Sequence, residues 1–200
     1  MSNSSPQARA DQKRPYRLGQ RALGKADTRQ RIVEAAVALH STLGPARTTV
    51  AQIAEKAGVQ RHTYYAHFPE ERELFLACSG LALERAPLPD VESWAALAPG
   101  GARLRHGLGQ LYGWYARNAE MTACVLRDAQ VHALTGEIAA LRMAPTFARA
   151  AELLGEGLGE RARALLAVAL GFGCWQTLAE GCTPDSAADL MTDAILAVSG

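Results

Sequence analysis

The sequence predicts an all-α fold with a small N-terminal helical domain and a larger C-terminal one. Apolar residues recur along most of the 200-residue chain with a period near 3.6, and no stretch shows the strict alternation of a strand. With 48% hydrophobic residues, the chain can bury a substantial core. Pro87 and Pro89, followed by a low-complexity stretch at 94–101, interrupt the helical pattern. We therefore expect an arm at 1–26, one domain at 27–86 and a second at 87–200.

The segment at 1–26 is polar and basic. It is rich in Ser, Gln, Arg and Lys, shows no apolar stripe, and includes Pro6, Pro15, Gly19 and Gly24. This composition disfavours a packed helix, so we expect a disordered arm. The first helix should then begin at Asp27, which can cap it, and end before Gly44. Its apolar stripe consists of Ile32, Val33, Ala36, Leu39 and Leu43.

The second helix has the clearest start. Thr49 and Gln52 stand three residues apart at the beginning of an apolar face, which is the spacing of a capping box. Gly58 is expected to end this helix. A short third helix fits residues 60–67, and Pro69 opens a fourth because proline suits the first helical turn.

Five further helices are expected in the C-terminal domain, at 103–117, 119–134, 144–157, 160–180 and 185–198. The fourth of these is apolar on nearly every side between Leu165 and Trp175, and such a helix needs neighbours all round. We therefore expect the helices at about 160–180 and 185–198 to form a four-helix interface in a homodimer. A simple buried core helix is the alternative.

Composition argues against several other classes of protein. The first stretch lacks the apolar core of a signal peptide, and no run reaches the roughly 20 apolar residues of a membrane span. These features predict a cytoplasmic protein without a membrane partner. The four cysteines have no paired spacing and are expected to be reduced.

Motifs for catalysis or metal binding are missing from the sequence. It contains no Walker loop, no His-Glu-x-x-His pair, no Cys-x-x-Cys and no nucleophile elbow. His62 and His67 are five residues apart, which puts them on different faces of a helix. We therefore expect no enzymatic activity, no metal and no cofactor.

Charge is divided unevenly along the chain. The net charge is +1, but residues 1–68 carry eleven Lys and Arg against four Asp and Glu, whereas residues 87–200 carry eight against twelve. Clustered cations gain free energy when they displace counterions from phosphate. The asymmetry indicates a polyanion partner at the N-terminal end, although a solvated basic surface would give the same charge count.

The helices expected around Gly58 match the plan of a helix-turn-helix. In that motif two helices are joined by a tight turn, and the second enters the major groove of DNA. The helix at 60–67 offers polar side chains suited to that task, namely Gln60, Arg61, His62, Thr63, Tyr65 and His67.

The segment TTVAQIAEKAGVQRHTYYAHFPEERELF, from Thr48 to Phe75, resembles the DNA-binding signature of the tetracycline-repressor-like (TetR/AcrR) family of transcriptional regulators. The helix before it also fits that family, whereas the C-terminal region is similar only in helix count and in its apolar terminal pair. The resemblance implies a homodimer that binds double-stranded DNA at a pseudo-palindromic operator. It further implies a repressor that a small-molecule ligand releases from that operator, without a cofactor.

Carried over by position, the resemblance assigns roles to the predicted DNA reader. It implies that Arg61 and His62 face base edges. Contacts to the DNA backbone are implied for Thr49, Thr63, Tyr65 and His67. Tyr64 stands where the family usually has an apolar residue, so we expect it to pack rather than to bind DNA.

Two positions depart from the family pattern. Gln60 stands where Ser or Thr is common, and Glu71 stands where a phosphate-binding Lys is common. An anion would repel phosphate, so either Glu71 turns away and Arg72 supplies the charge, or the basic arm provides the contact. The arm residues that would follow the minor groove are Arg14, Arg17, Arg21 and Lys25.

The resemblance also implies a small-molecule site among the middle helices. Side chains able to line an apolar cavity there are His106, Trp114, Tyr115, Met121, His132, Phe147, Phe172 and Trp175. Ordinary core packing is the alternative for each of them. Few charged residues are candidates for burial, which favours an apolar or aromatic ligand of unknown identity.

Two alternatives to a ligand-released repressor stay open. The same fold serves helical ligand-binding or interaction proteins with weak or lost DNA binding, an alternative that Glu71 favours and the basic arm disfavours. The chain can also be an activator, and no residue in the sequence separates the two regulatory signs.

Overall fold

The computed structural model describes the backbone of residues 6–199 and the side chains of residues 23–199. Over this range the chain is all-α, as predicted, and contains no strand. No helix within it is both long enough and apolar enough to cross a membrane.

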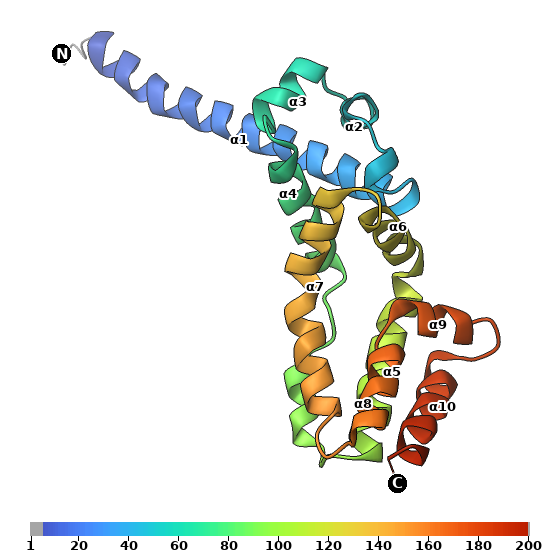
Figure 1. The fold of residues 1–200 in the computed structure, drawn as a ribbon. Coiled ribbons are helices and arrows are strands. Elements are labelled where there is room, and N and C mark those ends of the chain that lie inside the picture. The colour runs from blue at the N-terminus through green and yellow to red at the C-terminus, as the bar shows by residue number, and fades with distance from the viewer. Residues whose placement is uncertain (1–5, 200) are drawn as a thin grey trace.

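The N-terminal part consists of α1 (Pro6–Thr42), η1 (Pro45–Arg47), α2 (Val50–Ala57), α3 (Arg61–His67) and α4 (Glu71–Arg85). α2 and α3 lie together at one end of the molecule, next to the C-terminal half of α1 (Figure 1). α1 also packs against α2 and α4. The apolar stripes of these helices meet in one core that includes Ile32, Ala36, Ile53, Ala54, Phe68 and Leu74.

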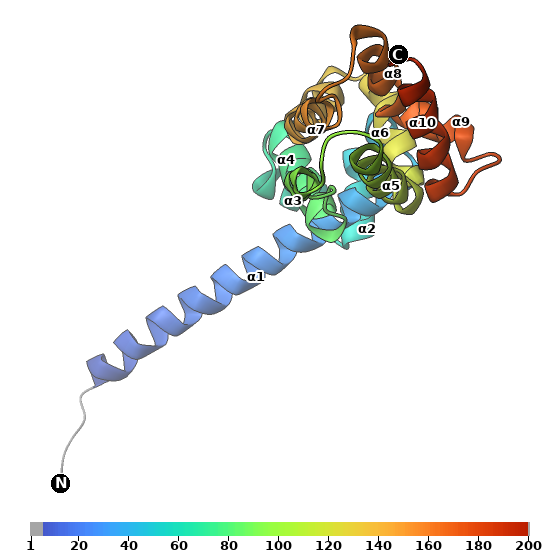
Figure 2. The ribbon, with the colours of Figure 1, turned by 90° about the horizontal axis from the view of Figure 1, so that it is seen from below.

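The start of α1 differs from the prediction. The helix begins at Pro6 rather than at Asp27, so it continues where a disordered arm was expected. Figure 2 shows its N-terminal half projecting away from the rest of the chain. Residues 7–14 are mostly Gln, Ala, Arg and Lys, which favour helix, and Pro6 occupies the first turn, where proline is tolerated. The expectation of disorder rested partly on Pro6 and Pro15, but Pro6 begins the helix and Pro15 lies within it.

The C-terminal part consists of η2 (Val91–Ala96), α5 (Gly101–Arg117), α6 (Ala119–Ala129), α7 (Ala133–Leu154), α8 (Glu160–Ala169), α9 (Phe172–Leu178) and α10 (Pro184–Ala197). α10 packs along α5, and η2 packs against α5 and α7. A second core lies among these helices and includes Trp94, Leu104, Leu108, Tyr112, Leu166 and Ile195. α6 contacts α1 and η1, and α7 contacts α4, so these two helices join the C-terminal part to the N-terminal part.

The boundary between α6 and α7 was predicted incorrectly. α6 ends at Ala129 rather than at residue 134, and α7 begins at Ala133 rather than at residue 144. Pro145 lies inside α7, where the contacts of α7 with α4 and α6 hold the helix. The true start is marked by His132, whose Nδ1 accepts a hydrogen bond from the amide of Thr135.

The single helix predicted at 160–180 is divided into α8 and α9. Gly171 separates them with an extended backbone, φ −75° and ψ 139°. The carbonyls that the break leaves free are bound by buried tyrosines, because Tyr112 Oη donates to Ala169 O at 2.9 Å and Tyr115 Oη donates to Leu170 O at 2.8 Å. The break is therefore stabilised by side chains of α5, which are distant in sequence.

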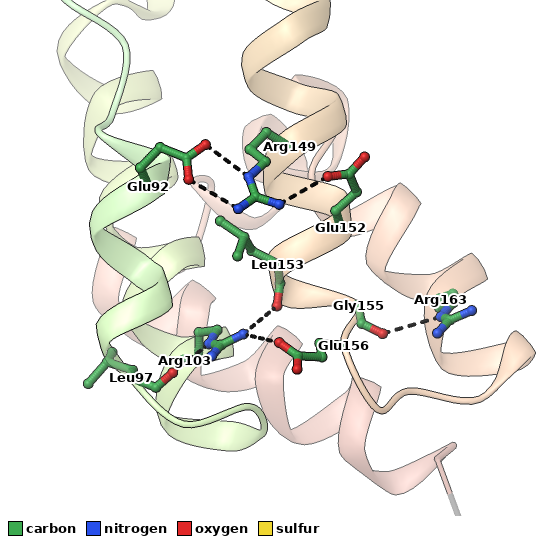
Figure 3. Close-up of polar contacts among 9 residues, drawn as sticks. All are labelled: Glu92, Leu97, Arg103, Arg149, Glu152, Leu153, Gly155, Glu156 and Arg163. Atoms are coloured by element: carbon green, nitrogen blue, oxygen red, sulfur yellow. Dashed lines mark hydrogen bonds and ion pairs between the residues drawn. The ribbon is translucent and has the colours of Figure 1, made fainter.

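A polar network closes the end of the C-terminal part that lies away from α3 (Figure 3). Arg149 on α7 forms two hydrogen bonds with the Glu92 carboxylate of η2, at 2.9 and 3.1 Å. Arg103 is 5% exposed and donates to Leu97 O, to Leu153 O and to the Glu156 carboxylate. Because these guanidinium groups are matched by carbonyls and carboxylates, the network ties η2, α5 and α7 together.

Candidate nucleic-acid interface and interdomain cavity

α2 and the turn after it have the predicted geometry. Thr49 Oγ1 accepts from the amide of Gln52 at 3.3 Å, and Gln52 Oε1 accepts from the amide of Thr49 at 2.8 Å, which confirms the capping box. Gly58 ends α2 in the left-handed conformation with φ 65°. Arg31 on α1 donates to Ala57 O at 3.0 Å and so fixes the turn to the core. The start and end of α2 are thus both defined by specific hydrogen bonds.

α3 presents a polar surface to solvent. Gln60, Arg61 and His62 are exposed at its N-terminal end, and Tyr65 is 53% exposed. Thr63 is half-buried and its hydroxyl lies 3.3 Å from Nε2 of His62. The structure therefore brings the predicted reader residues together on one short helix.

The opposite face of α3 is anchored in the core. Tyr64 is 3% exposed and packs against Tyr65 and Phe68, with ring centroids 5.3 and 6.1 Å away. Burial raises the pKa of Tyr64 to about 12, so its hydroxyl stays neutral. Arg29 on α1 lies over the Phe68 ring at 4.2 Å, a cation–π contact. The packing role expected for Tyr64 is confirmed.

His67 ends α3 in a half-buried position. Burial lowers its pKa, and the neighbouring charges of Lys25 and Arg29 lower it further. The imidazole is therefore neutral near pH 7. It can form a hydrogen bond to a phosphate but does not add a positive charge.

Glu71 and Arg72, at the start of α4, point toward the C-terminal part. Glu71 Oε1 lies 3.9 Å from Nε2 of His132, and Arg72 forms an ion pair with Glu137 at 2.6 Å. Glu71 thus turns away from the exposed face of α3, as the first alternative required. Arg72 does not supply the missing charge there, because it is paired with Glu137 on α7 instead. This pairing could not be inferred from the sequence because it joins helices far apart along the chain.

The predicted basic arm is described only in part. The side chains of Arg14, Arg17 and Arg21 lie outside the described residues. Lys25 is described and exposed, on the same helix as Arg29.

An apolar cavity of about 120 Å³ lies where the two parts of the chain meet, and we call it the interdomain cavity. α1 and α4 provide one side of it, through residues that include Val37, His40, Phe75 and Cys78. α6 and α7 provide the other side, through residues that include Met121, Thr122, Ile138 and Arg142. Trp114 of α5 completes the wall.

The structure brings only some of the predicted ligand-binding residues to this cavity. Trp114 and Met121 line it, and His132 is adjacent, with its ring centroid 5.6 Å from that of Phe75. Four others pack together as an aromatic cluster in the C-terminal core, namely Tyr115, Phe147, Phe172 and Trp175. His106 is exposed on α5 and contacts Gln110. Aromatic content therefore identified core residues more often than cavity residues.

Sequence reasoning missed the polar residues of the cavity wall. His40 is 7% exposed, and burial lowers its pKa to about 4, partly offset by the charge of Asp128 and reinforced by that of His132. Its Nδ1 lies 3.6 Å from Sγ of Cys78, whose pKa burial raises to about 12. His40 follows the apolar stripe of the first helix, one turn after Ala36. A polar residue on an otherwise apolar stripe was the feature of the sequence that could have identified His40 as part of a site.

A second group of hydrogen bonds connects the two parts of the chain beside the cavity. The Asp128 carboxylate of α6 accepts from the amide of Ala46 at 2.8 Å and from Arg127 Nε at 2.8 Å. Arg127 also donates to Leu43 O at 2.8 Å. Desolvation raises the pKa of Asp128, but the hydrogen bonds from Arg127 and Ala46 and the charges of Arg127 and Arg47 outweigh it, so the net pKa is lowered. α6 is therefore fixed to the end of α1 through an ionised carboxylate.

The rest of the described part of the chain offers no candidate metal site and no pocket with an excess of one charge. Residues 23–199 contain no group of three or more His, Cys, Asp or Glu side chains placed to hold a metal ion. A hollow at the end shown in Figure 3 is lined by Arg149, Glu152, Glu156 and Arg163. Its two basic and two acidic side chains offset one another, so it favours no charged ligand.

Comparison with known protein families gives a match over the helix-turn-helix segment. Residues 32–78 match the family described as bacterial regulatory proteins, tetR family. The chain carries a tetR-family domain. This range covers the C-terminal part of α1, all of α2 and α3, and the first half of α4, which are the elements that form the N-terminal core. No curated protein matches the chain significantly.

Solved structures extend the likeness to the whole TetR fold. A proposed TetR-family transcriptional regulator from Mesorhizobium loti is 20% identical, with 88% of this chain and 98% of that chain covered and a TM-score of 0.59. A proposed fatty acid metabolism regulator from Clostridium perfringens is 22% identical, with coverage of 84% and 97% and a TM-score of 0.61. A TetR-like regulator from Rhodococcus is 24% identical, with coverage of 86% and 96% and a TM-score of 0.59. The chain thus shares both the N-terminal helix-turn-helix domain and the helical C-terminal domain of these proteins.

Proposed function

We propose that this chain is a homodimeric, sequence-specific DNA-binding transcriptional regulator, and that it is a repressor released from its operator by a small molecule. The observation that carries the proposal is the exposure of Arg61, His62 and Tyr65 on a short helix that is anchored in a tetR-family domain. In this proposal residues 27–86 bind DNA, and residues 87–200 bind the ligand and form the dimer. The regulatory sign follows the family resemblance.

The exposed face of α3 supports specific roles in DNA binding. Arg61 and His62 stand at the N-terminal end of the helix and read base edges in the major groove. Contacts to the DNA backbone come from Thr49, Gln60, Thr63, Tyr65 and His67. The hydroxyl of Thr49 already donates to Gln52 Oε1, so it reaches a phosphate by exchanging that hydrogen bond. Arg14, Arg17, Arg21 and Lys25 extend the interface into the minor groove.

Exposed apolar side chains on α8 and α10 support the homodimer. Val168 is 59% exposed and Leu190 is 51% exposed, on two helices that pack against each other. Small apolar residues continue these faces at Ala164, Ala167 and Ala197. A second copy would cover the faces in a four-helix arrangement, with two helices from each subunit. Two readers related by such a two-fold axis would bind a pseudo-palindromic operator.

The position of the interdomain cavity supports control by a ligand. Its wall is shared between α1 and α4 on one side and α6 and α7 on the other. A molecule in the cavity contacts both domains, and it shifts the equilibrium if it binds better to one of their arrangements than to the other. We infer that the arrangement it favours has lower affinity for the operator.

The alternative of a protein with lost DNA binding loses its main argument. Glu71 was the feature in its favour, since an anion facing phosphate would repel it. Its carboxylate instead lies 3.9 Å from His132 of the C-terminal part. An activator with the same contacts is distinguished only by the effect of the protein on transcription.

Electrophoretic mobility shift with DNA from upstream of its own gene tests the proposal. Arg61→Ala and Tyr65→Ala should each weaken binding about tenfold or more, since each removes a side chain that we place on the DNA. Arg117→Ala removes an exposed Arg at the end of α5 and serves as the matched control for charge. Binding that is absent at low salt, or that responds equally to all three variants, would contradict the assignment of α3 as the reader.

A further inference from the structure

The size of the interdomain cavity limits the molecule that it can hold. Its volume is about 120 Å³, whereas sites for drug-sized ligands span roughly 300–1,000 Å³. In another protein, an engineered apolar cavity of about 150 Å³ binds benzene. The interdomain cavity is slightly smaller than that one, so we expect it to accept at most one six-membered ring.

The walls are suited to an apolar ring. Side chains from both domains surround the space, including Val37, Phe75, Leu83, Val125, Ile138 and Met143. A ring placed among them replaces empty space by close contacts, which individually are weak and together are substantial. The same ring would touch α1 and α4 of the DNA-binding domain together with α6 and α7.

Two polar groups of the wall lack a partner. Nε2 of His40 and Oγ1 of Thr122 form no hydrogen bond with a described residue, and neither atom is fully enclosed, since the enclosed atoms without a partner are His67 Nδ1 and Thr192 Oγ1. Polar atoms that face a pocket form their hydrogen bonds with water or with a ligand. Both residues line the cavity, so a ligand in it can supply the missing hydrogen bonds.

A hydroxyl group fits these two partners better than other polar groups. His40 is neutral, and its Nδ1 lies beside Cys78, so Nε2 is an acceptor or a donor depending on the tautomer. A hydroxyl both donates and accepts, and it satisfies His40 in either tautomer. It can form the second hydrogen bond with the hydroxyl of Thr122 in the same way.

A carboxylate is a poorer choice for this site. Arg142 is the one cation among the residues described as lining the cavity. It already donates to Ser79 Oγ at 3.1 Å and to Leu76 O at 2.9 Å, and both bonds hold it against α4. An anion among the apolar side chains would lose its hydration without a free cation in compensation.

We infer that the interdomain cavity binds a neutral single-ring phenol, with the ring among the apolar side chains and the hydroxyl at His40 and Thr122. This inference rests on the proposed function, because it names the class of ligand for the site that we place in control of DNA binding. The inference adds to that function a ligand of one ring, a required hydroxyl group, and the two residues that form hydrogen bonds with this hydroxyl.

Calorimetric titration of the full-length protein with phenol tests the inference. Phenol should bind in the micromolar to millimolar range expected for so small a ligand. Benzene, which lacks the hydroxyl, should bind about three- to tenfold more weakly because one or two hydrogen bonds are lost. Benzoate and 2-naphthol should not bind, because of their charge and size respectively. Absence of phenol binding, or equal affinity for phenol and 2-naphthol, overturns the inference.

Isosteric variants separate recognition of the hydroxyl from general packing. Thr122→Val should weaken phenol binding about three- to tenfold and leave benzene binding unchanged. Thr192 is the matched control, since it is fully buried on α10, also lacks a hydrogen-bond partner for Oγ1 and does not line the cavity. Thr192→Val should change neither affinity. If Thr122→Val has no effect on phenol, or weakens benzene as much, the hydroxyl is not read at this position.

The same preparation distinguishes failure of this inference from failure of the proposed function. Protein that shifts operator DNA but does not bind phenol retains the proposed function and refutes the ligand class. Protein that binds phenol but does not bind the DNA retains the site and refutes the assignment as a DNA-binding regulator. Phenol should also reduce the fraction of operator DNA that is bound by the wild type more than the fraction bound by Thr122→Val.

Discussion

The carboxylate of Asp128 accepts a hydrogen bond from the backbone amide of Ala46, 82 residues earlier in the chain, at 2.8 Å. Asp128 is 2% exposed and is also bound by Arg127 Nε. Arg127 in turn donates to Leu43 O. The corner between α1 and η1, which leads into the helix-turn-helix, is therefore held by one short segment of α6.

Asp128→Ala should lower the free energy of unfolding by about 2–4 kcal/mol, because the amide of Ala46 and the guanidinium of Arg127 lose a buried acceptor. Chemical denaturation followed by circular dichroism measures the change. Asp193→Ala is the control, since that carboxylate is exposed and lies 3.5 Å from Arg105; its expected cost is below about 1 kcal/mol. Equal losses in the two variants would contradict a special role for Asp128.

Gly44→Ala should be more damaging than Gly157→Ala. Both glycines have positive φ, 95° and 78°, which disfavours any residue with a Cβ. At Gly44 a Cβ would also clash with the side chains of Arg127 and Asp128, whereas at Gly157 nothing lies within 4 Å. Thermal unfolding should show a loss of about 1 kcal/mol for Gly157→Ala and a clearly larger one for Gly44→Ala. Similar losses would mean that the segment of α6 moves aside easily.

His40 should make the protein less stable in mild acid. Burial lowers its pKa from the ordinary value of 6.5 to about 4 in the folded state. Between these values the unfolded chain binds more protons, so the free energy of unfolding falls as the pH drops from 6.5 to 4. The contribution is about 3 kcal/mol over that window.

Denaturation of His40→Gln across this pH range measures the effect. In His40→Gln the free energy of unfolding should fall much less as the pH drops. His106→Gln, at an exposed position, should show the same fall as the wild type. An unchanged slope in His40→Gln would show that another group titrates.

Val168→Glu should produce a monomer. The substitution places a charge on the exposed apolar face of α8, where we propose that a second copy packs. Sedimentation velocity should show a dimer for the wild type and a monomer for the variant. Leu141→Glu is the control, because Leu141 is 54% exposed on α7, outside the proposed interface. A monomeric wild type, or dissociation by both variants, contradicts the assignment.

Local signals predicted the helix-turn-helix well. Thr49 and Gln52 define the start of α2, and Gly58 defines its end, because each acts through hydrogen bonds or backbone geometry within a few residues. The expected start of α3 at residue 60 differs from the structure by one position, since Gln60 is its N-cap. These features depend on short-range chemistry, which is fully contained in the sequence of the segment itself.

Features set by distant residues were not predictable in the same way. The break at Gly171 depends on hydroxyls of Tyr112 and Tyr115, and the orientation of Glu71 depends on His132. Periodicity states which residues are apolar but not which of two helices each will face. For this reason Phe172 and Trp175 were expected at a ligand site and lie in the core, whereas His40 was not singled out and lines the cavity.

The shared wall of the interdomain cavity has a thermodynamic consequence. Because α1 and α4 carry part of that wall, the cavity keeps its shape only for one placement of the DNA-binding domain against α6 and α7. If the operator selects a different placement, the factor by which ligand weakens DNA binding equals the factor by which DNA weakens ligand binding. Ligand affinity measured without DNA is then an upper limit, and it should fall as operator is added.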